Sequence, residues 1–267
     1  MKYVKFKIIM KNKYSKKNKK SIQKFHSIYG INGSIQVLKS KKFEIARIDI
    51  MSDGNAFRKS EIKSILTRFK GRVHTLPKEV FLKNYSGKRT QGIVVHFKGE
   101  IYQNIPSFKN SKLDCCLLIL DNIEDPQNLG QIIRTAEGGG VNGIVIPEHK
   151  STGLTNSTLQ VSQGAFVHLP VYRCKNLRHQ IKELKSDGFW IYALENSIDA
   201  KLWYEIDLRG KVAIVLGSEG RGIRKLVLKE CDGYATIPMK GKINSLNVSA
   251  ATSAIVFEIL RQKTCNQ

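Results

Sequence analysis

The second half of the chain alternates between short apolar runs and longer segments with helical spacing. From Leu113 onward the apolar runs are continuous, which is typical of strands buried on both faces. The predicted strands are Cys115–Leu120, Gly143–Ile146, Phe166–Leu169, Phe189–Leu194, Val212–Leu216 and Tyr234–Ile237. The predicted helices are Leu129–Glu137, Thr155–Gly164, Leu177–Ser186, Ile223–Glu230 and Val248–Arg261. This order predicts an α/β domain over residues 113–267, with a mostly parallel sheet and helices on both faces.

The pattern before this domain is less regular and predicts a smaller α/β unit over residues 25–98. The segment Ser27–Leu38 is typical of a turn that enters a helix. The predicted strands are Glu44–Ile50, Val73–Thr75 and Gly92–Lys98, and further helices are expected across Ser60–Phe69 and after Pro77 at an N1 position. Residues 99–112 have little periodicity and contain Pro106, so we expect a linker there.

The net charge of the chain indicates nucleic acid as the class of partner. The chain has 45 Lys and Arg against 22 Asp and Glu, a net charge of +23. Residues 1–24 hold ten lysines and no acid, which predicts a basic disordered arm without a secretion signal. A surplus of 13 remains outside that arm, which favours a polyanionic partner. A Lys-rich coding bias explains part of the excess.

Cysteine and histidine usage adds no further chemistry. None of the five cysteines forms a CxxC pair, and Cys115 and Cys116 lie in an apolar run, so we expect buried thiols in a reducing cytoplasm. The six histidines lack metal-ligand spacing, so no metal is expected. No apolar run reaches the roughly 18 residues of a membrane span, so no membrane partner is expected.

Three polar loops follow predicted strands, namely Asp121–Asn128, Gly217–Gly222 and Pro238–Asn247. Ligands of parallel α/β sheets bind outside the carboxyl ends of the strands, so these loops predict a ligand site. The second loop, GSEGRG, lacks a P-loop lysine and the GxGxxG spacing, and Glu219 argues against phosphate at that point.

Each polar residue in the other two loops also has a purely structural interpretation. Asn128 and Asn247 are placed as helix N-caps, and Arg134 fits a surface cation. The functional alternative for Asn128 and Arg134 is a polar pair that meets a phosphate or a ribose hydroxyl. The run Gly138–Gly140 fits a helix stop better than a phosphate loop.

Taken together and in this order, the loops resemble those of a known family. Residues 114–261 resemble the SpoU/TrmH-type RNA 2′-O-ribose methyltransferases of the SPOUT superfamily, through DPQNLGQIIRTAE, VLGSEGRGI and IPMKGKINSLNVSAA. The segments SIYGINGSIQVL and LTNSTLQVSQGAFVHLPV are similar to bacterial 23S rRNA guanosine-2′-O-methyltransferases. In that subgroup an RNA-binding domain similar to ribosomal protein L30e precedes the catalytic domain, and residues 25–98 resemble it.

The resemblance implies a deep trefoil knot, bound S-adenosylmethionine and a homodimer whose active site draws on both subunits. It implies that the backbone of Gly217, Ile237 and Leu246, with the neighbours Leu216 and Met239, holds the cofactor. It also implies a catalytic Arg134 surrounded by the polar residues Asn128, Glu219, Ser245 and Asn247. Arginine stays protonated in proteins, which disfavours it as a base. Alkoxide stabilisation and binding of the adjacent phosphate stay open.

The expected activity is therefore 2′-O-methylation of a ribose in RNA, with a guanosine in the P loop of 23S rRNA as the preferred target. A tRNA ribose methyltransferase is the first alternative. The second alternative is an RNA-binding ribosome-assembly protein without turnover. The five intact polar positions argue against that second alternative, because a protein without turnover would be free to lose them.

Overall fold

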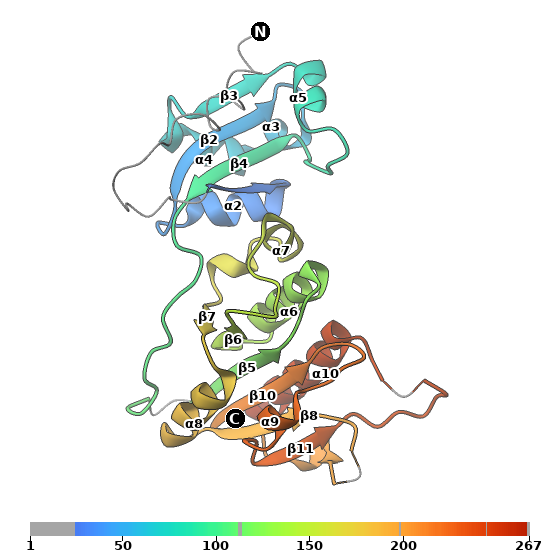
Figure 1. Cartoon of the computed structure of the whole chain (residues 1–267). Coiled ribbons are helices and arrows are strands. Elements are labelled where there is room, and N and C mark those ends of the chain that lie inside the picture. The colour runs from blue at the N-terminus through green and yellow to red at the C-terminus, as the bar shows by residue number, and fades with distance from the viewer. Residues whose placement is uncertain (1–24, 112–113, 198, 244, 266–267) are drawn as a thin grey trace, which may run out of the picture.

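The computed structural model describes residues 25–111, 114–197, 199–243 and 245–265. The predicted basic arm at residues 1–24 lies outside these ranges. Two sheets form two units, with the N-terminal unit stacked on one end of the C-terminal unit (Figure 1). No helix in the described ranges is both long enough and apolar enough to cross a membrane.

The N-terminal unit is a four-stranded sheet in the order β1-β4-β2-β3, with helices around it. Its strands are β1 (Phe25–Tyr29), β2 (Glu44–Met51), β3 (Val73–Leu76) and β4 (Ile93–Lys98). Its helices are α2 (Ile31–Lys39), α3 (Asn55–Arg58), α4 (Ser60–Leu66), α5 (Lys78–Asn84) and the 3₁₀ turn η1 (Thr67–Phe69). β4 pairs antiparallel with β1 and β2, and only β2 and β3 are parallel. β1 therefore lies at an edge of the sheet.

The C-terminal unit is a seven-stranded parallel sheet in the order β7-β6-β5-β10-β8-β11-β9. Its strands are β5 (Cys115–Asp121), β6 (Gly143–Pro147), β7 (Val171–Cys174), β8 (Trp190–Leu194), β9 (Lys201–Leu202), β10 (Lys211–Gly217) and β11 (Gly233–Thr236). Its helices are α6 (Pro126–Gly138), α7 (Asn156–Val161), α8 (Leu177–Ser186), α9 (Lys225–Leu228), α10 (Val248–Thr264) and the 3₁₀ turns η2 (Ala165–Val167) and η3 (Trp203–Glu205).

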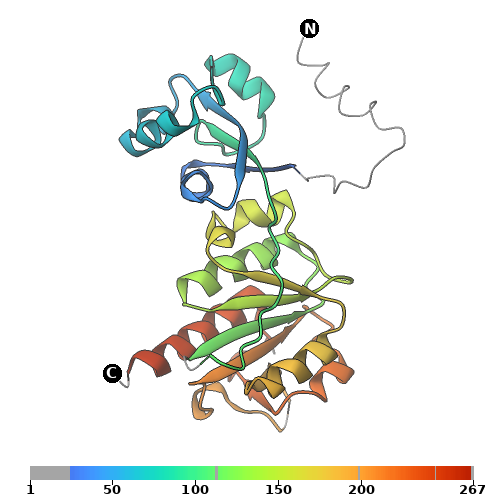
Figure 2. The same cartoon turned by 90° about the vertical axis from the view of Figure 1, so that its left-hand side faces the viewer.

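Alternate residues of the central strand β5 enter two different cores. Cys116, Leu118 and Leu120 pack on the side of α6 and α10, and Cys115, Leu117 and Ile119 pack on the side of α8. Figure 2 shows α6 and α10 on one face of the sheet and α8 with α9 on the other. Because both faces are covered, every residue of β5 is buried, which explains its continuous apolar run. The predicted parallel α/β architecture is confirmed.

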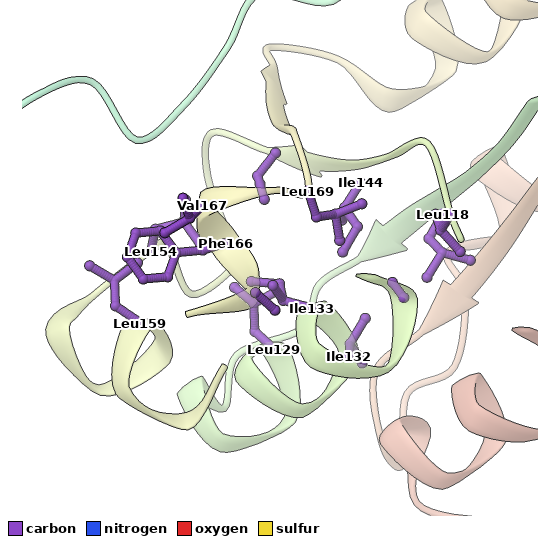
Figure 3. Packing of buried hydrophobic residues seen from close by; sticks show 14 of the residues in the cluster. Leu118, Leu129, Ile132, Ile133, Ile144, Leu154, Leu159, Phe166, Val167 and Leu169 are labelled. Carbon is purple, nitrogen blue, oxygen red and sulfur yellow. The ribbon is translucent and has the colours of Figure 1, made fainter. Parts of the chain in front are cut away.

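The predicted strand Phe166–Leu169 is wrong. This segment belongs to the 3₁₀ turn η2 and the residues after it, and the strand of this region is Val171–Cys174. The apolar run has another cause, because Phe166 packs on Phe43 and Phe97 of the N-terminal unit, with ring centroids 6.0 and 6.1 Å apart. Figure 3 shows Phe166 and Val167 in the core beside Leu154 and Leu159.

Two further element predictions need correction. The start of Ser27–Leu38 is not a turn, because Phe25–Tyr29 forms the edge strand β1 before α2 begins at Ile31. The helix predicted over Ile223–Glu230 shortens to α9 (Lys225–Leu228). Arg224 precedes it in an extended conformation, with φ −59° and ψ 135°, because its side chain and its N–H are both bound elsewhere.

Polar and apolar contacts join the two units, and together they are named the inter-unit interface here. The amide of Gln160 on α7 pairs with the edge strand β1: its Oε1 accepts from the N–H of Tyr29 at 2.9 Å, and its Nε2 donates to the carbonyl of Tyr29 at 2.8 Å. Asn156, one turn earlier, accepts from the N–H of Ser27 at 3.2 Å. Because one core also runs through Phe43, Phe97 and Phe166, the two units hold a fixed orientation.

The predicted linker runs along the C-terminal unit and contacts it repeatedly (Figure 1). Gln103 forms a parallel bridge with Tyr172, and the hydroxyl of Tyr102 accepts from the N–H of Leu154 at 2.6 Å. Further along, the N–H of Phe108 donates to the carboxylate of Asp187 at 2.7 Å. The connection is therefore anchored at several points.

Candidate functional site

A pocket of about 700 Å³ lies at the carboxyl ends of β8, β10 and β11. Its walls come from the segment after β8, the GSEGRG loop after β10, and the long loop between β11 and α10. That last loop extends away from the body of the unit (Figure 1). The residues predicted to hold the cofactor all line this pocket, namely Leu216, Gly217, Ile237, Met239 and Leu246.

The GSEGRG loop folds back on itself and leaves no room for a side chain at Gly217. A Cβ there would lie 2.2 Å from the carbonyl carbon of Gly222. The N–H of Gly222 donates to the carbonyl of Ser218 at 2.9 Å, which closes the turn. Gly220 and Gly222 have φ angles of +77° and +63°, in the region that favours glycine. The glycines therefore shape a tight turn with Glu219 near its tip.

Three of the predicted catalytic residues meet at one edge of the pocket, and they are named the amide–carboxylate cluster here. The Nδ2 of Asn128 donates to the Oε1 of Glu219 at 2.9 Å. The Nδ2 of Asn247 donates to the Oδ1 of Asn128 at 3.1 Å and also to the Oε1 of Glu219. Two neutral amides thus hold one oxygen of the carboxylate, although the three residues lie far apart in the sequence.

The helix caps explain how these amides are positioned. The N-cap of α6 is Asp125, whose side chain accepts from the N–H of Gln127 at 2.9 Å, so the predicted N-cap role of Asn128 is wrong. Asn128 lies inside the first turn of α6, after Pro126, and its side chain is free to reach the cluster. Asn247 is the N-cap of α10, as predicted, and its Oδ1 accepts from the N–H of Ser249 at 2.8 Å.

Contacts between α6 and α10 support the cluster from behind. The hydroxyl of Ser249 donates to the Oε1 of Gln131 at 2.8 Å, and the hydroxyls of Thr135 and Ser253 lie 3.3 Å apart. The two helices lie side by side on one face of the sheet (Figure 2). The relative position of Asn128 and Asn247 is therefore set by helix packing as well as by their own hydrogen bond.

An ion pair that the sequence analysis missed holds the far end of the glycine-rich turn. The carboxylate of Asp121, at the end of β5, is fully buried. It accepts from the Nε of Arg224 at 2.8 Å and from the backbone N–H of Arg224 at 2.9 Å. The signal in the sequence is an acid that directly ends an apolar strand, CCLLILD, because a buried carboxylate needs a partner.

Among the described residues, no hydrogen bond or ion pair joins the remaining predicted catalytic residues, Ser245 and Arg134, to the cluster. Ser245 is exposed and lines the pocket. Arg134 is exposed on α6, six residues after Asn128, and within the described ranges it makes no hydrogen bond or ion pair. Whether Ser245 and Asn247 reach toward Arg134, as the resemblance implies, stays a prediction.

The cysteines contribute no reactive thiolate to this site. All five are free, and burial raises the pKa of Cys116 and Cys231 to about 12 and that of Cys174 to about 11. These three thiols therefore stay protonated at neutral pH. In the part of the chain that the structure describes, no group of three or more His, Cys, Asp and Glu side chains could hold a metal ion.

Known proteins match the C-terminal unit alone in one comparison and most of the chain in another. The profile of the SpoU rRNA methylase family matches residues 116–257. A Staphylococcus haemolyticus protein that carries the name of the TrmH family tRNA/rRNA methyltransferases is 38% identical over 213 residues, which is 77% of this chain and 85% of that protein. A Staphylococcus aureus protein with the same name is 38% identical over 212 residues.

Two solved structures superpose on 90% of this chain, and a third superposes on 62% of it. An AdoMet-bound rRNA methyltransferase of Sinorhizobium meliloti superposes with a TM-score of 0.72 at 22% identity, covering 90% of this chain and 88% of that chain. The SpoU methyltransferase AviRb of Streptomyces viridochromogenes, in complex with AdoMet, has a TM-score of 0.74 at 16% identity, covering 90% and 91%. A TrmH/SpoU tRNA modifying enzyme of A. aeolicus has a TM-score of 0.53 at 25% identity, covering 62% and 80%.

Proposed function

Because the chain belongs to the SpoU/TrmH family of S-adenosylmethionine-dependent RNA methyltransferases, we propose that it methylates a ribose 2′-hydroxyl of large-subunit ribosomal RNA. The preferred target is a guanosine in the P loop of 23S rRNA. The C-terminal unit has the knotted SPOUT fold of this family, and S-adenosylmethionine is the cofactor. The observation that carries the proposal is the amide–carboxylate cluster at the edge of the cofactor pocket.

The residues of the pocket fit this cofactor. Its volume of about 700 Å³ lies within the range of roughly 300–1,000 Å³ that small-ligand sites have. Leu216, Ile237 and Leu246 supply apolar walls, and Gly217 brings bare backbone to the surface of the pocket. When bound, the cofactor supplies the methyl group and an electron-poor sulfur as the leaving group.

The chain's own contribution is to orient the ribose and to accept its proton. A 2′-hydroxyl is a weak nucleophile and loses its proton as it attacks, so a nearby acceptor in line with the methyl group lowers the barrier. The Oε1 of Glu219 is taken up by the amides of Asn128 and Asn247, and its Oε2 is left to accept from the substrate hydroxyl. The two amides keep this carboxylate in one orientation.

Arg134 completes the site from the partner subunit of a homodimer. Among the described residues of one chain, its exposed guanidinium makes no hydrogen bond or ion pair, and a cation is what an incipient alkoxide or the neighbouring phosphate needs. An apolar stripe on the adjacent α10 supports the dimer, since Ala250, Ala254 and Phe257 recur at helical spacing and Phe257 is 52% exposed.

The N-terminal unit, which resembles an L30e-like domain, binds the RNA and favours rRNA over tRNA. Neighbours named for tRNA cover a smaller share of this chain: the A. aeolicus enzyme covers 62%, and a structure described as showing 2-OH methylation of C/U34 on tRNA covers 57%. The S. meliloti rRNA methyltransferase covers 90%. The solved structure of an RNA 2′-O ribose methyltransferase also covers 90% of this chain, with a TM-score of 0.72.

A cytoplasmic location fits this role. The five cysteines are free thiols, as is usual in a reducing compartment, and ribosomal RNA is made and assembled in the cytoplasm of bacteria.

The test is methyl transfer in vitro from labelled S-adenosylmethionine to 23S rRNA and, separately, to bulk tRNA, with nuclease mapping of the product. We expect label on a ribose 2′-oxygen of 23S rRNA. Label only on tRNA would favour the tRNA alternative, and label on a base would contradict the ribose assignment. Mixing Arg134→Ala subunits with Glu219→Gln subunits tests the dimer, because a shared site regains activity in the mixed dimer.

A further inference from the structure

A second carboxylate lines the cofactor pocket, and neither the motifs nor the cluster uses it. Glu195 directly follows β8, and its backbone N–H donates to the carbonyl of Ala235 at 2.9 Å, which continues the pairing of β8 with β11. β10 separates β8 from β5 in the sheet, and α6 with Asn128 follows β5. Glu195 therefore belongs to the wall of the pocket that is remote from Asn128.

The two carboxylates of the pocket differ in their partners. The Oε1 of Glu219 already accepts from two amides. The side chain of Glu195 is half-buried, and among the described residues it makes no hydrogen bond or ion pair. A partly buried carboxylate without partners is costly, and a ligand that donates hydrogen bonds removes that cost.

The carboxylate of Glu195 faces the backbone of the glycine-rich turn. A Cβ on Gly222 would lie 3.7 Å from its Oε2 and 3.9 Å from its Oε1, so both oxygens lie at similar distances from one point beside Gly222. Since Gly222 has no side chain, the space beside both oxygens stays open to the pocket. Two acceptors at one place suit a ligand with two neighbouring donors.

We infer that Glu195 binds the two ribose hydroxyls of S-adenosylmethionine. A vicinal diol offers two donors to the two oxygens of a carboxylate, and a carboxylate after a strand holds a ribose hydroxyl in dinucleotide-binding folds. The methionyl end fits less well, because its own carboxylate would be repelled by Glu195. This inference rests on the cofactor of the proposed function and is independent of the RNA target.

Binding measurements with two cofactor analogues test this assignment without any methyl transfer. S-adenosylhomocysteine has both the ribose and the amino-acid end, and 5′-methylthioadenosine has the ribose but no amino-acid end. Isothermal titration calorimetry gives the Kd of each for the wild-type chain, Glu195→Ala, Glu195→Gln and the control Glu183→Gln, an exposed residue of α8 outside the pocket. Thermal unfolding of each variant checks that it is folded.

We expect Glu195→Ala to weaken both analogues by the same factor, about tenfold or more, because each loses hydrogen bonds to a charged group. Glu195→Gln should lose less, since its amide keeps one acceptor, and Glu183→Gln should bind like the wild type. The Glu195→Ala penalty should vanish for 5′-methylthio-2′,3′-dideoxyadenosine, which lacks both hydroxyls.

Two results would overturn the inference. Unchanged Kd values for both analogues in Glu195→Ala would remove Glu195 from cofactor binding. A loss confined to S-adenosylhomocysteine would assign Glu195 to the ammonium of the amino-acid end. A failure of the proposed function looks different, because the wild-type chain itself would then bind neither analogue.

Discussion

The cofactor pocket and the inter-unit interface are built by different kinds of contact. In the pocket, a glycine-rich turn and three polar side chains meet through backbone and amide groups. In the interface, an aromatic cluster around Phe166 and the amide of Gln160 join two units through side-chain packing. Under the proposed function, the pocket carries the chemistry, and the interface fixes where an RNA bound by the N-terminal unit would lie relative to the pocket. Changes in one region should therefore leave the other largely intact.

The substitution with the largest expected effect, Phe166→Ala, lies in the inter-unit interface. Phe166 is 5% exposed and packs on Phe43 and Phe97, so Phe166→Ala leaves a cavity in the core that the two units share. We expect a loss of about 3–5 kcal/mol in the free energy of unfolding, typical of a buried Phe→Ala change. Urea unfolding measures it, with the more exposed Phe57→Ala as control. A loss no greater than that of the control would mean that the aromatic contact does not hold the units together.

The substitution with the next largest expected effect, Gly217→Ala, lies in the pocket. Gly217→Ala places a methyl group 2.2 Å from the backbone of Gly222, so the turn has to open. We expect cofactor affinity to fall by at least about 100-fold, because opening the turn to relieve this clash costs several kcal/mol. The matched control is Gly241→Ala, where a Cβ meets nothing within 4 Å. Calorimetric titration measures both, and wild-type affinity in Gly217→Ala would contradict the described turn.

This contrast also explains what could be predicted from the sequence. Apolar runs of strands covered on both faces, such as β5, are unambiguous, and the parallel sheet followed from them. The glycine and asparagine motifs act over a few residues, and Gly217, Glu219 and Asn247, which they singled out, line the pocket. The roles of these residues stay predictions. The strand predicted at Phe166–Leu169 was wrong, because a strand and an interface between units can each bury a run of apolar residues.

Contacts between distant residues could not be predicted in the same way. The cap of α6 is Asp125, so Asn128 reaches Glu219 instead, and only the fold shows that the two side chains meet. The Asp121–Arg224 pair was missed for the same reason. Periodicity reports which face of an element is buried, but it does not report which polar groups from other loops share that face.

A third substitution, Glu219→Gln, separates two properties of the pocket, which are binding of the cofactor and transfer of its methyl group. Glu219→Gln keeps the shape of the side chain and weakens its ability to accept the ribose proton. We expect the rate of methyl transfer to fall by about 10- to 100-fold while the Kd for S-adenosylhomocysteine stays close to that of the wild type. Single-turnover assays and calorimetry separate the two quantities, with Glu205→Gln as control. A parallel loss in both would assign Glu219 to cofactor binding.

The smallest expected effect concerns the polar half of the interface. Gln160→Ala removes both hydrogen bonds to Tyr29 and leaves the edge of β1 without that partner. We expect a loss of about 1–2 kcal/mol in the free energy of unfolding, with no change in cofactor affinity. Gln163→Ala on the neighbouring turn is the control, because among the described residues its amide bonds only to Gln160, within the same unit. Equal losses in the two variants would show that the Tyr29 contact adds nothing specific.

The most direct test of the central claim is a map of 2′-O-methylation in total RNA from cells with and without the gene. The account predicts that one methylated ribose of 23S rRNA disappears on deletion. It also predicts that the wild-type gene restores this mark and that Arg134→Ala does not. A 23S rRNA pattern that is unchanged by deletion, with a mark lost from tRNA, would contradict the rRNA assignment. Full restoration by Arg134→Ala would contradict the mechanism.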